Sequence, residues 1–225
     1  MGPGWHMGEE TAGQPSVIDR LLYDGAAEIG AVAAALRRRR PRFVLFAARG
    51  TSDHAAFYGK YLAEIQLGLP AGLVSPSGST VYGAGPDLRE VLFIAVSQSG
   101  GSPDLLDSLT AAHSCGAATL DVMNNSDSTL AGAAEYAIDV RAGLERAVAA
   151  TKSYVAELVA LWLLIVGLAE RPTPAAAPLA DAARRTLDGT APVAEVAAAR
   201  YRFADRIVTT GLGYSYPSAR GANSN

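Results

Sequence analysis

Short apolar runs alternate with segments of helical periodicity along the middle of the chain. Residues 43–48, 91–96 and 117–123 are largely apolar runs bounded by turn residues, which is typical of strands buried on both faces. Shorter runs at residues 71–74 and 136–140 bring the expected strands to five. The strand–helix alternation predicts an α/β fold: a five-stranded, parallel, doubly wound sheet at the centre of a three-layer α-β-α sandwich.

Segments without this alternation precede and follow the predicted sheet. Apolar positions at helical spacing predict a helix before the first strand, and a Pro/Ala-rich stretch after residue 170 predicts a linker. Beyond the linker we expect helices at residues 179–186 and 193–203 and a new strand at 206–210. The chain then divides into a flexible N-terminus (1–14), an N-terminal helical lead-in (15–40), a main domain (41–170), a linker with helices (171–205) and the start of an incomplete, truncated second domain (206–225).

One long apolar helix is expected at residues 149–168. Its longest apolar run, residues 158–169, is too short to cross a bilayer, and Glu157 and Glu170 flank it. We interpret it as a buried helix and expect no membrane contact. In the alternative interpretation the helix exposes an apolar face and forms the interface of a homodimer.

A small polar loop follows the third predicted strand. Residues 97–102 read SQSGGS, and Ser102 and Pro103 are residue types favoured at the N-cap and the first position of a helix. Free N–H groups at a helix N-terminus, serine hydroxyls, and glycines that allow close approach together favour an anion such as phosphate. An ordinary strand–helix loop with a serine cap is the alternative, and this loop alone does not decide between the two.

A second loop of the same kind follows the first predicted strand. Thr51 and Ser52 stand where residues 43–48 give way to a helical pattern. In a parallel sheet both loops lie at the carboxyl ends of their strands, where such folds bind their ligands. Because the two polar loops lie together at one edge of the sheet, we favour the interpretation that they bind a phosphate group.

Charge and composition argue against several kinds of binding partner and site. The net charge is −3, and the one basic run, residues 37–40, lies at the end of an expected helix, where cations are favourable. We therefore expect no nucleic-acid binding. Cys115 is the only cysteine, which excludes an intramolecular disulfide and fits a reducing compartment. The three histidines lack metal-ligand spacing and the N-terminus lacks an apolar secretory signal, so we expect a cytoplasmic protein without a metal site.

Four stretches, taken in order, carry a family resemblance. They are residues 48–56 (ARGTSDHAA), 97–102 (SQSGGS), 145–152 (ERAVAATK) and 211–217 (GLGYSYP). Together they resemble the sugar isomerase (SIS) domain family, most closely the isomerase half of glucosamine-6-phosphate synthase and related amino-sugar phosphate isomerases or deaminases. The resemblance implies a phosphosugar site made of Ser97, Gln98, Ser99 and Ser102 at the phosphate, Thr51 and Ser52 at the sugar and its phosphate end, and the Val148 backbone at the sugar.

The resemblance also bears on catalysis. Aldose–ketose isomerisation needs a base that moves a proton between two carbons, and in the family this base is a Glu of the second SIS domain. The sequence after residues 211–217 holds no such Glu. We therefore expect no catalytic base in this chain, no cofactor and impaired turnover. Glu145 and Glu157 do not occupy the position of the base, and we expect Glu145 to have a structural or loop-contact role.

Two functions remain open. In the first, the chain is part of an amino-sugar phosphate isomerase, a deaminase or a glutaminase-lacking aminotransferase that acts on fructose 6-phosphate or glucosamine 6-phosphate. Gly101 stands where the synthase has Glu, which favours the isomerase and deaminase relatives. In the second, the chain is a non-catalytic module that senses a phosphosugar or regulates a partner. Both predict phosphosugar binding at residues 97–102, and we expect a homodimer.

Overall fold

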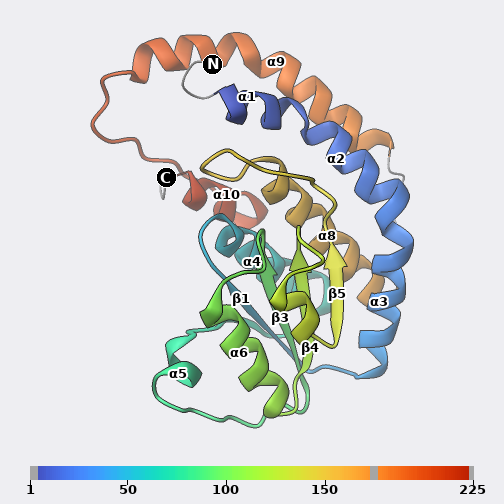
Figure 1. Ribbon diagram of the computed structural model, residues 1–225. Coiled ribbons are helices and arrows are strands. Elements are labelled where there is room, and N and C mark those ends of the chain that lie inside the picture. Colours follow the sequence, from blue (N-terminus) through green and yellow to red (C-terminus); the bar gives the residue numbers. More distant parts are fainter. Residues whose placement is uncertain (1–4, 173–176, 223–225) are drawn as a thin grey trace.

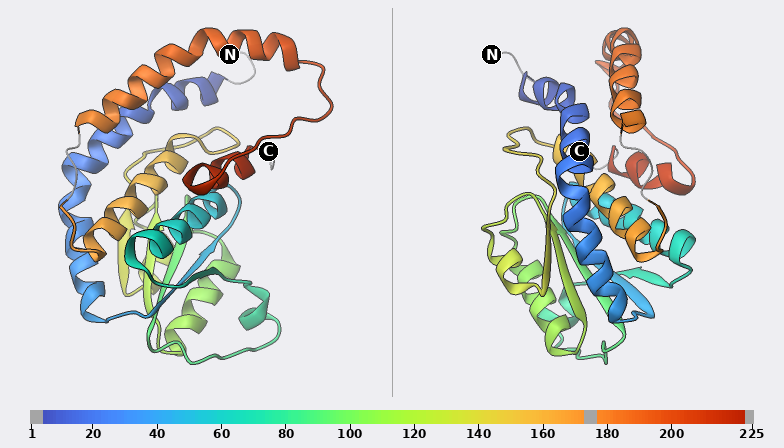
Figure 2. Two further views of the ribbon diagram at one scale, coloured as in Figure 1. Left: turned by 180° about the vertical axis from the view of Figure 1, so that it is seen from behind. Right: turned by 90° about the vertical axis from the view of Figure 1, so that its right-hand side faces the viewer.

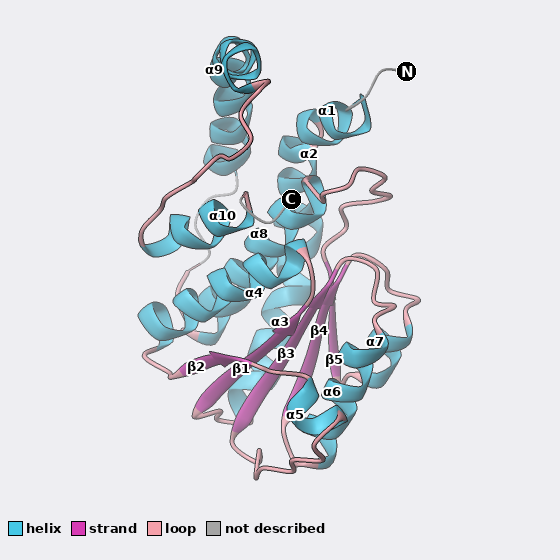
Figure 3. Ribbon diagram, turned by 90° about the vertical axis from the view of Figure 1, so that its left-hand side faces the viewer, coloured by secondary structure: helices cyan, strands magenta, loops and turns pink. Residues whose placement is uncertain are grey.

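A parallel sheet forms the centre of the protein, as the alternation of apolar runs predicts. The computed structural model describes residues 5–172 and 177–222. All strand pairs are parallel, and the strand order is β2-β1-β3-β4-β5. Figure 3 shows the strands between two layers of helices. The strands are β1 (Phe43–Ala48), β2 (Ala71–Leu73), β3 (Val91–Ser97), β4 (Ala118–Met123) and β5 (Tyr136–Asp139).

Helices cover both faces of this sheet (Figures 1 and 2). On one face lie α3 (Ala26–Arg38), α4 (Thr51–Leu62) with a π-helical extension (Ala63–Leu67), and α8 (Lys152–Leu168). On the other lie α5 (Ser77–Thr80), α6 (Pro103–Ser114) and α7 (Thr129–Ala133). The expected three-layer α-β-α sandwich with a five-stranded parallel sheet is confirmed.

Strand β3 shows why its sequence is apolar throughout. Ile94 and Val96 belong to the core cluster on the α8 side of the sheet, whereas Phe93 and Ala95 belong to the cluster on the α6 side. Strands β1 and β4 flank β3 and take up its backbone hydrogen bonds. A strand that is covered on both faces has no polar side to present, and its sequence does not alternate.

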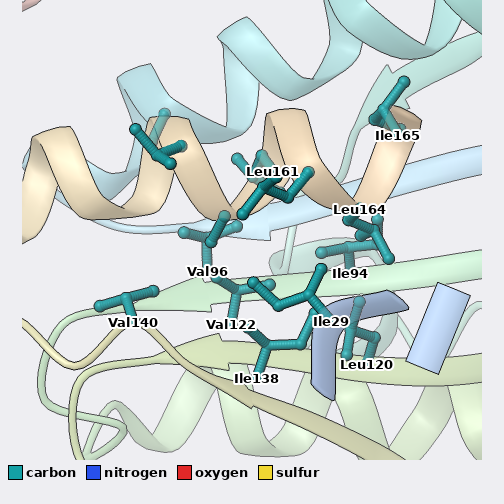
Figure 4. Close-up of a cluster of buried hydrophobic side chains, with 14 of the residues drawn as sticks. Ile29, Ile94, Val96, Leu120, Val122, Ile138, Val140, Leu161, Leu164 and Ile165 are labelled. Carbon is teal, nitrogen blue, oxygen red and sulfur yellow. The ribbon is translucent and has the colours of Figure 1, made fainter. Parts of the chain in front are cut away.

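Helix α8 runs through the larger core cluster (Figure 4). Leu161, Leu164 and Ile165 are fully buried, and α8 packs against both α3 and α4. The chain itself covers most of the apolar side chains of α8, as expected for a buried helix. Leu158 and Trp162 are only partly buried, and the homodimer stays a prediction. No helix within the described ranges has the length and hydropathy needed to cross a membrane.

The N-terminal region contains more regular structure than the sequence predicts. The segment expected to be flexible includes the helix α1 (Trp5–Ala12), and the lead-in is divided into α2 (Gln14–Arg20), a π-helical turn (Leu21–Gly25) and α3. The division falls at Gly25, a residue that weakens helices. Helix α1 has no apolar face that a pattern could reveal, since its one buried residue is Glu10.

The C-terminal region differs more from the sequence-based expectation. The two helices expected at 179–186 and 193–203 are one helix, α9 (Ala177–Tyr201), with Pro192 inside it. Residues 206–210, expected as a strand, form no strand and are mostly exposed, and no strand of the described residues pairs with them. The expected linker falls partly on residues 173–176, which lie outside the described residues.

The last described segment folds back onto the first face of the sheet. A 3₁₀ turn (Gly213–Ser215) and the helix α10 (Tyr216–Gly221) pack on α4. The ring of Tyr216 meets that of Phe57 edge to face at 5.6 Å. The hydroxyls of Tyr154 and Ser218 are 2.9 Å apart. Aromatic contacts with α4 and a hydroxyl contact with α8 therefore take the place of the strand pairing that we expected in this part of the chain.

Strand β4 carries an acidic residue inside the sheet. Asp121 lies between Leu120 and Val122 and is completely buried, and neither of its carboxyl oxygens has a hydrogen-bond partner. Burial without a partner disfavours the charged form and raises the pKa of Asp121 to about 7. The folded protein therefore holds this proton to a higher pH than the unfolded chain does.

We expect Asp121 to make the protein less stable as pH rises. Because its pKa is raised in the folded state, its stabilising contribution is complete below about pH 4 and is lost as pH rises through about 7. The full loss amounts to about 4 kcal/mol, because each tenfold change in proton affinity corresponds to about 1.4 kcal/mol. Asp121→Asn should reduce the change in melting temperature between about pH 5 and about pH 8, and the raised pKa of Glu157, about 8, accounts for the part that remains.

The matched control is Asp107→Asn on the exposed side of α6. It should leave the pH dependence of the melting temperature as in the wild type. If Asp121→Asn shows the same pH dependence as the wild type, Asp121 does not titrate in this range in the folded state.

Candidate functional site

The two hydroxyl loops lie side by side. Strands β1 and β3 are direct neighbours, and Ala48 at the end of β1 is paired with Val96 near the end of β3. The loops that follow these strands therefore leave the sheet at the same edge. The side chain of Arg49, in the first loop, forms an ion pair with Asp104 at the start of α6, which links the two loops directly. The predicted meeting of the loops is confirmed.

Loop 97–102 is braced by its own serines. The Ser97 hydroxyl, at the end of β3, accepts a hydrogen bond from the Gly100 N–H at 3.0 Å, and the Ser99 hydroxyl accepts one from the Gly101 N–H at 3.4 Å. Ser102 occupies the N-cap of α6 with extended backbone, and Pro103 is the first helical residue, both as predicted. The positive end of the α6 dipole thus lies beside the loop.

Gly100 is required by the shape of this loop. Its φ is +63°, a conformation that side chains with a Cβ rarely adopt. A Cβ at this position would also lie 2.2 Å from the Ser128 hydroxyl oxygen, at the N-cap of α7. The loop can therefore pack against α7 only with a glycine here.

Several predicted site residues keep their polar groups free. Within the described residues, the side chains of Thr51, Gln98 and Ser102 have no hydrogen-bond partner. All three are partly exposed, and Ser99 is exposed. The loops together present several hydroxyls and one amide that an incoming anion could bind.

Ser52 is placed differently. It is nearly buried, and its hydroxyl donates a hydrogen bond of 2.8 Å to Glu157 on α8. The other carboxyl oxygen of Glu157 is buried without a partner. Burial is the main cause that raises the pKa of Glu157 to about 8, and the nearby carboxyls of Glu145 and Asp121 act in the same direction. In this structure Ser52 thus braces the start of α4 against α8.

Val148 lies in the segment between β5 and α8. It is 95% exposed. Glu145, in the same segment, accepts hydrogen bonds from the N–H groups of Thr151, Lys152 and Ser153 at 2.6 to 3.0 Å and so caps α8. Burial tends to raise the pKa of Glu145, but hydrogen bonds from Ser153 and Thr151 outweigh it and lower that pKa. The structural role expected for Glu145 is confirmed.

Two asparagines after β4 join the neighbouring segments. Asn125 donates from its amide to the Ser99 carbonyl at 3.4 Å. Asn124 donates to the Gly143 carbonyl at 2.7 Å and accepts the Ala142 N–H at 2.8 Å. The turn after β4 therefore bridges loop 97–102 and the segment that carries Val148.

Sequence reasoning missed Arg49, Asp104, Asn125 and the partnership of Ser52 with Glu157. The position of Arg49 and of Asn125 directly after strands was a usable signal, since such residues gather at one edge of a parallel sheet. Glu157 gave no such signal, because it stands 105 residues from Ser52 in the chain. No group of three or more His, Cys, Asp or Glu side chains within the described parts of the chain is arranged to hold a metal ion.

Solved structures share this architecture. A crystal structure from Silicibacter pomeroyi DSS-3, assigned to a phosphosugar isomerase, is 40% identical, has a TM-score of 0.72, and matches 89% of this chain and 58% of its own. The C-terminal domain of glucosamine-fructose-6-phosphate aminotransferase from Francisella tularensis has a TM-score of 0.77 at 22% identity, and the match covers 98% of this chain and 66% of that one. The second likeness shows the fold alone.

Curated relatives agree with these structures. Glutamine–fructose-6-phosphate aminotransferase (isomerizing) from Methanothermobacter thermautotrophicus is 33% identical over 207 residues, which is 92% of this chain and 34% of the relative. This chain thus spans about a third of that relative's length. The family profile of the SIS domain matches residues 39–167, which include β1 to β5 and nearly all of α8. By its fold, its relatives and this match, the chain belongs to the SIS domain family.

Proposed function

We propose that this protein binds a sugar phosphate at the edge of the sheet formed by residues 51–52 and 97–102. The observation that supports this most directly is the set of partnerless polar side chains, Thr51, Gln98 and Ser102, beside the N-terminus of α6. Partly exposed hydroxyls without an internal partner, a glycine-shaped loop and a helix N-terminus are the elements from which proteins build phosphate sites.

Each residue has a distinct part in the proposed site. Ser99 and Ser102 donate hydroxyl hydrogen bonds to phosphate oxygens, and Gln98 donates from its amide. Ser97 holds the loop through Gly100 and keeps its own proton available for the ligand. Thr51 contacts the phosphate end from the neighbouring loop. Ser52 is nearly buried and bonded to Glu157, so its contribution is to fix the start of α4.

The proposed ligand class is a hexose or amino-hexose 6-phosphate. The names of the relatives support this choice, since the archaeal relative is named for fructose 6-phosphate. The hydroxyls of the sugar would then lie toward the segment that carries Val148, which Asn124 ties to the same edge of the sheet. Within this class, Gly101 in place of the synthase's Glu favours an amino-sugar phosphate isomerase or deaminase over a strict synthase.

We propose binding without efficient turnover for these 225 residues. A base for proton transfer between sugar carbons must be accessible and able to lose its proton. Glu145 is engaged by the N-terminus of α8, Glu157 is buried against Ser52, and Asp121 lies inside the sheet. These three carboxyls are therefore poor candidates for the base. The same observation supports the second candidate, a phosphosugar-sensing module.

Ser99→Ala should weaken phosphosugar binding. A hydrogen bond to a charged phosphate contributes about 1.5 to 3 kcal/mol, so the dissociation constant for glucosamine 6-phosphate should rise by about 10- to 100-fold. Because Ser99 is exposed and its hydroxyl makes only a 3.4 Å internal bond, the melting temperature should hardly change. Isothermal titration calorimetry measures the affinity.

Ser114→Ala is the matched control, since Ser114 is an exposed serine at the far end of the same helix. It should bind as the wild type does. Equal affinity of the wild type and Ser99→Ala, or absence of binding in both, would refute the site assignment.

Gly100→Ala should abolish measurable binding where Gly101→Ala does not. The Cβ at position 100 meets Ser128 at 2.2 Å and needs an unfavourable φ, so the loop must change shape. At position 101 the nearest atom to a Cβ is the Ser99 hydroxyl oxygen at 3.8 Å, an ordinary contact. Titration of both variants with fructose 6-phosphate tests this, and tight binding by Gly100→Ala would show that the loop conformation is not used.

A further inference from the structure

Helix α1 contacts the segment between β5 and α8 through one buried side chain. Glu10 is only 7% exposed, although it lies in a short helix near the N-terminus. Its two carboxyl oxygens accept the N–H groups of Arg146 at 2.6 Å and Ala147 at 3.0 Å. Figure 1 shows α1 above this segment. The contact joins residues that are 136 positions apart in the sequence.

Two glutamates hold this segment on either side of a short unbonded stretch. Glu10 accepts the N–H groups of residues 146 and 147, and Glu145 accepts those of residues 151–153. Between them, the N–H groups of residues 148–150 have no hydrogen-bond partner within the described part of the chain. Three consecutive backbone donors are therefore held in place and left available.

The bonds made by Glu10 are costly to lose. Loss of the hydrogen-bond partner of a partly buried backbone N–H destabilises that backbone conformation by about 1 to 3 kcal/mol. The segment would then favour a different conformation in which water binds the N–H. Residues 143, 144, 146 and 148 are exposed, so apolar packing does little to hold this segment. Its shape depends on the side chains that hydrogen-bond to its backbone, which are those of Glu10, Glu145 and Asn124.

We infer that Glu10 is a positioning residue of the phosphosugar site: it fixes residues 146–147 so that the free N–H groups of residues 148–150 face the sugar end of the ligand. This inference rests on the proposed function. It assigns a part of the site to helix α1, which lies outside residues 39–167 that the family profile matches. The phosphate end of the ligand depends on loop 97–102 and not on Glu10.

This division of roles predicts a ligand-dependent effect. In the full chain, Glu10→Ala should raise the dissociation constant for glucosamine 6-phosphate about tenfold, which corresponds to about 1.4 kcal/mol. It should leave the affinity for inorganic phosphate within about twofold, since that ion contacts only loop 97–102 and Thr51. Glu10→Gln, which keeps one acceptor oxygen, should fall between the wild type and Glu10→Ala. Hydrogen exchange of the amides of residues 146 and 147 should become faster in Glu10→Ala.

Glu9 provides the matched control, because it is the adjacent glutamate of the same helix and is exposed. Glu9→Ala should bind both ligands as the wild type does. If Glu10→Ala binds glucosamine 6-phosphate as tightly as the wild type, or loses affinity for both ligands equally, the inference is overturned while the proposed function stands. If the wild type binds neither ligand, the proposed function fails and the inference fails with it.

Discussion

The parallel pairing of β1 with β3 is the constraint on which the rest of the site depends. In a parallel pair both strands end at the same edge, so the two loops that follow them are neighbours whatever their sequences. The register places Ala48 opposite Val96, and the first polar residues after each strand are therefore level with each other. The ion pair between Arg49 and Asp104 then joins the loops. Without this pairing, the hydroxyls of the two loops would not lie together at one edge of the sheet.

Four buried or partly buried carboxyl groups contribute to the fold in different ways. Glu145 and Glu10 accept backbone N–H groups and thereby shape the segment before α8. Glu157 receives the Ser52 hydroxyl and fixes the start of α4. Asp121 has no hydrogen-bond partner among the described residues and is surrounded by the core. The hydrogen bonds from backbone N–H groups and from the Ser52 hydroxyl offset the free-energy cost of removing a carboxylate from water. Asp121 has no such bond, and its pKa is therefore raised.

The groups suited to ligand binding and the groups that could transfer a proton differ in their surroundings. The sheet edge offers hydroxyls, an amide and backbone N–H groups, which suit recognition of a phosphosugar. Three nearby carboxyls have structural surroundings: Glu145 caps α8, Glu157 receives the Ser52 hydroxyl, and Asp121 lies inside the sheet. The chain spans about a third of the length of the relative from Methanothermobacter thermautotrophicus.

The sequence by itself determined the sheet, its five strands and the loops that carry the polar residues, because burial on both faces leaves continuous apolar runs with turn residues between them. The sequence also predicted that the Gly- and Ser-rich loops lie at the carboxyl ends of the strands and that Ser102 is the N-cap of a helix. Only the tertiary structure decided what the terminal segments do: α1 is held by Glu10, α9 runs through Pro192, and residues 206–210 do not pair as a strand. It also decided that Ser52 faces Glu157 and that α8 is covered. The physical reason is the distance between the interacting residues along the chain. Local sequence patterns report burial and turns, whereas these contacts join residues far apart in the chain and produce no periodic pattern in the sequence.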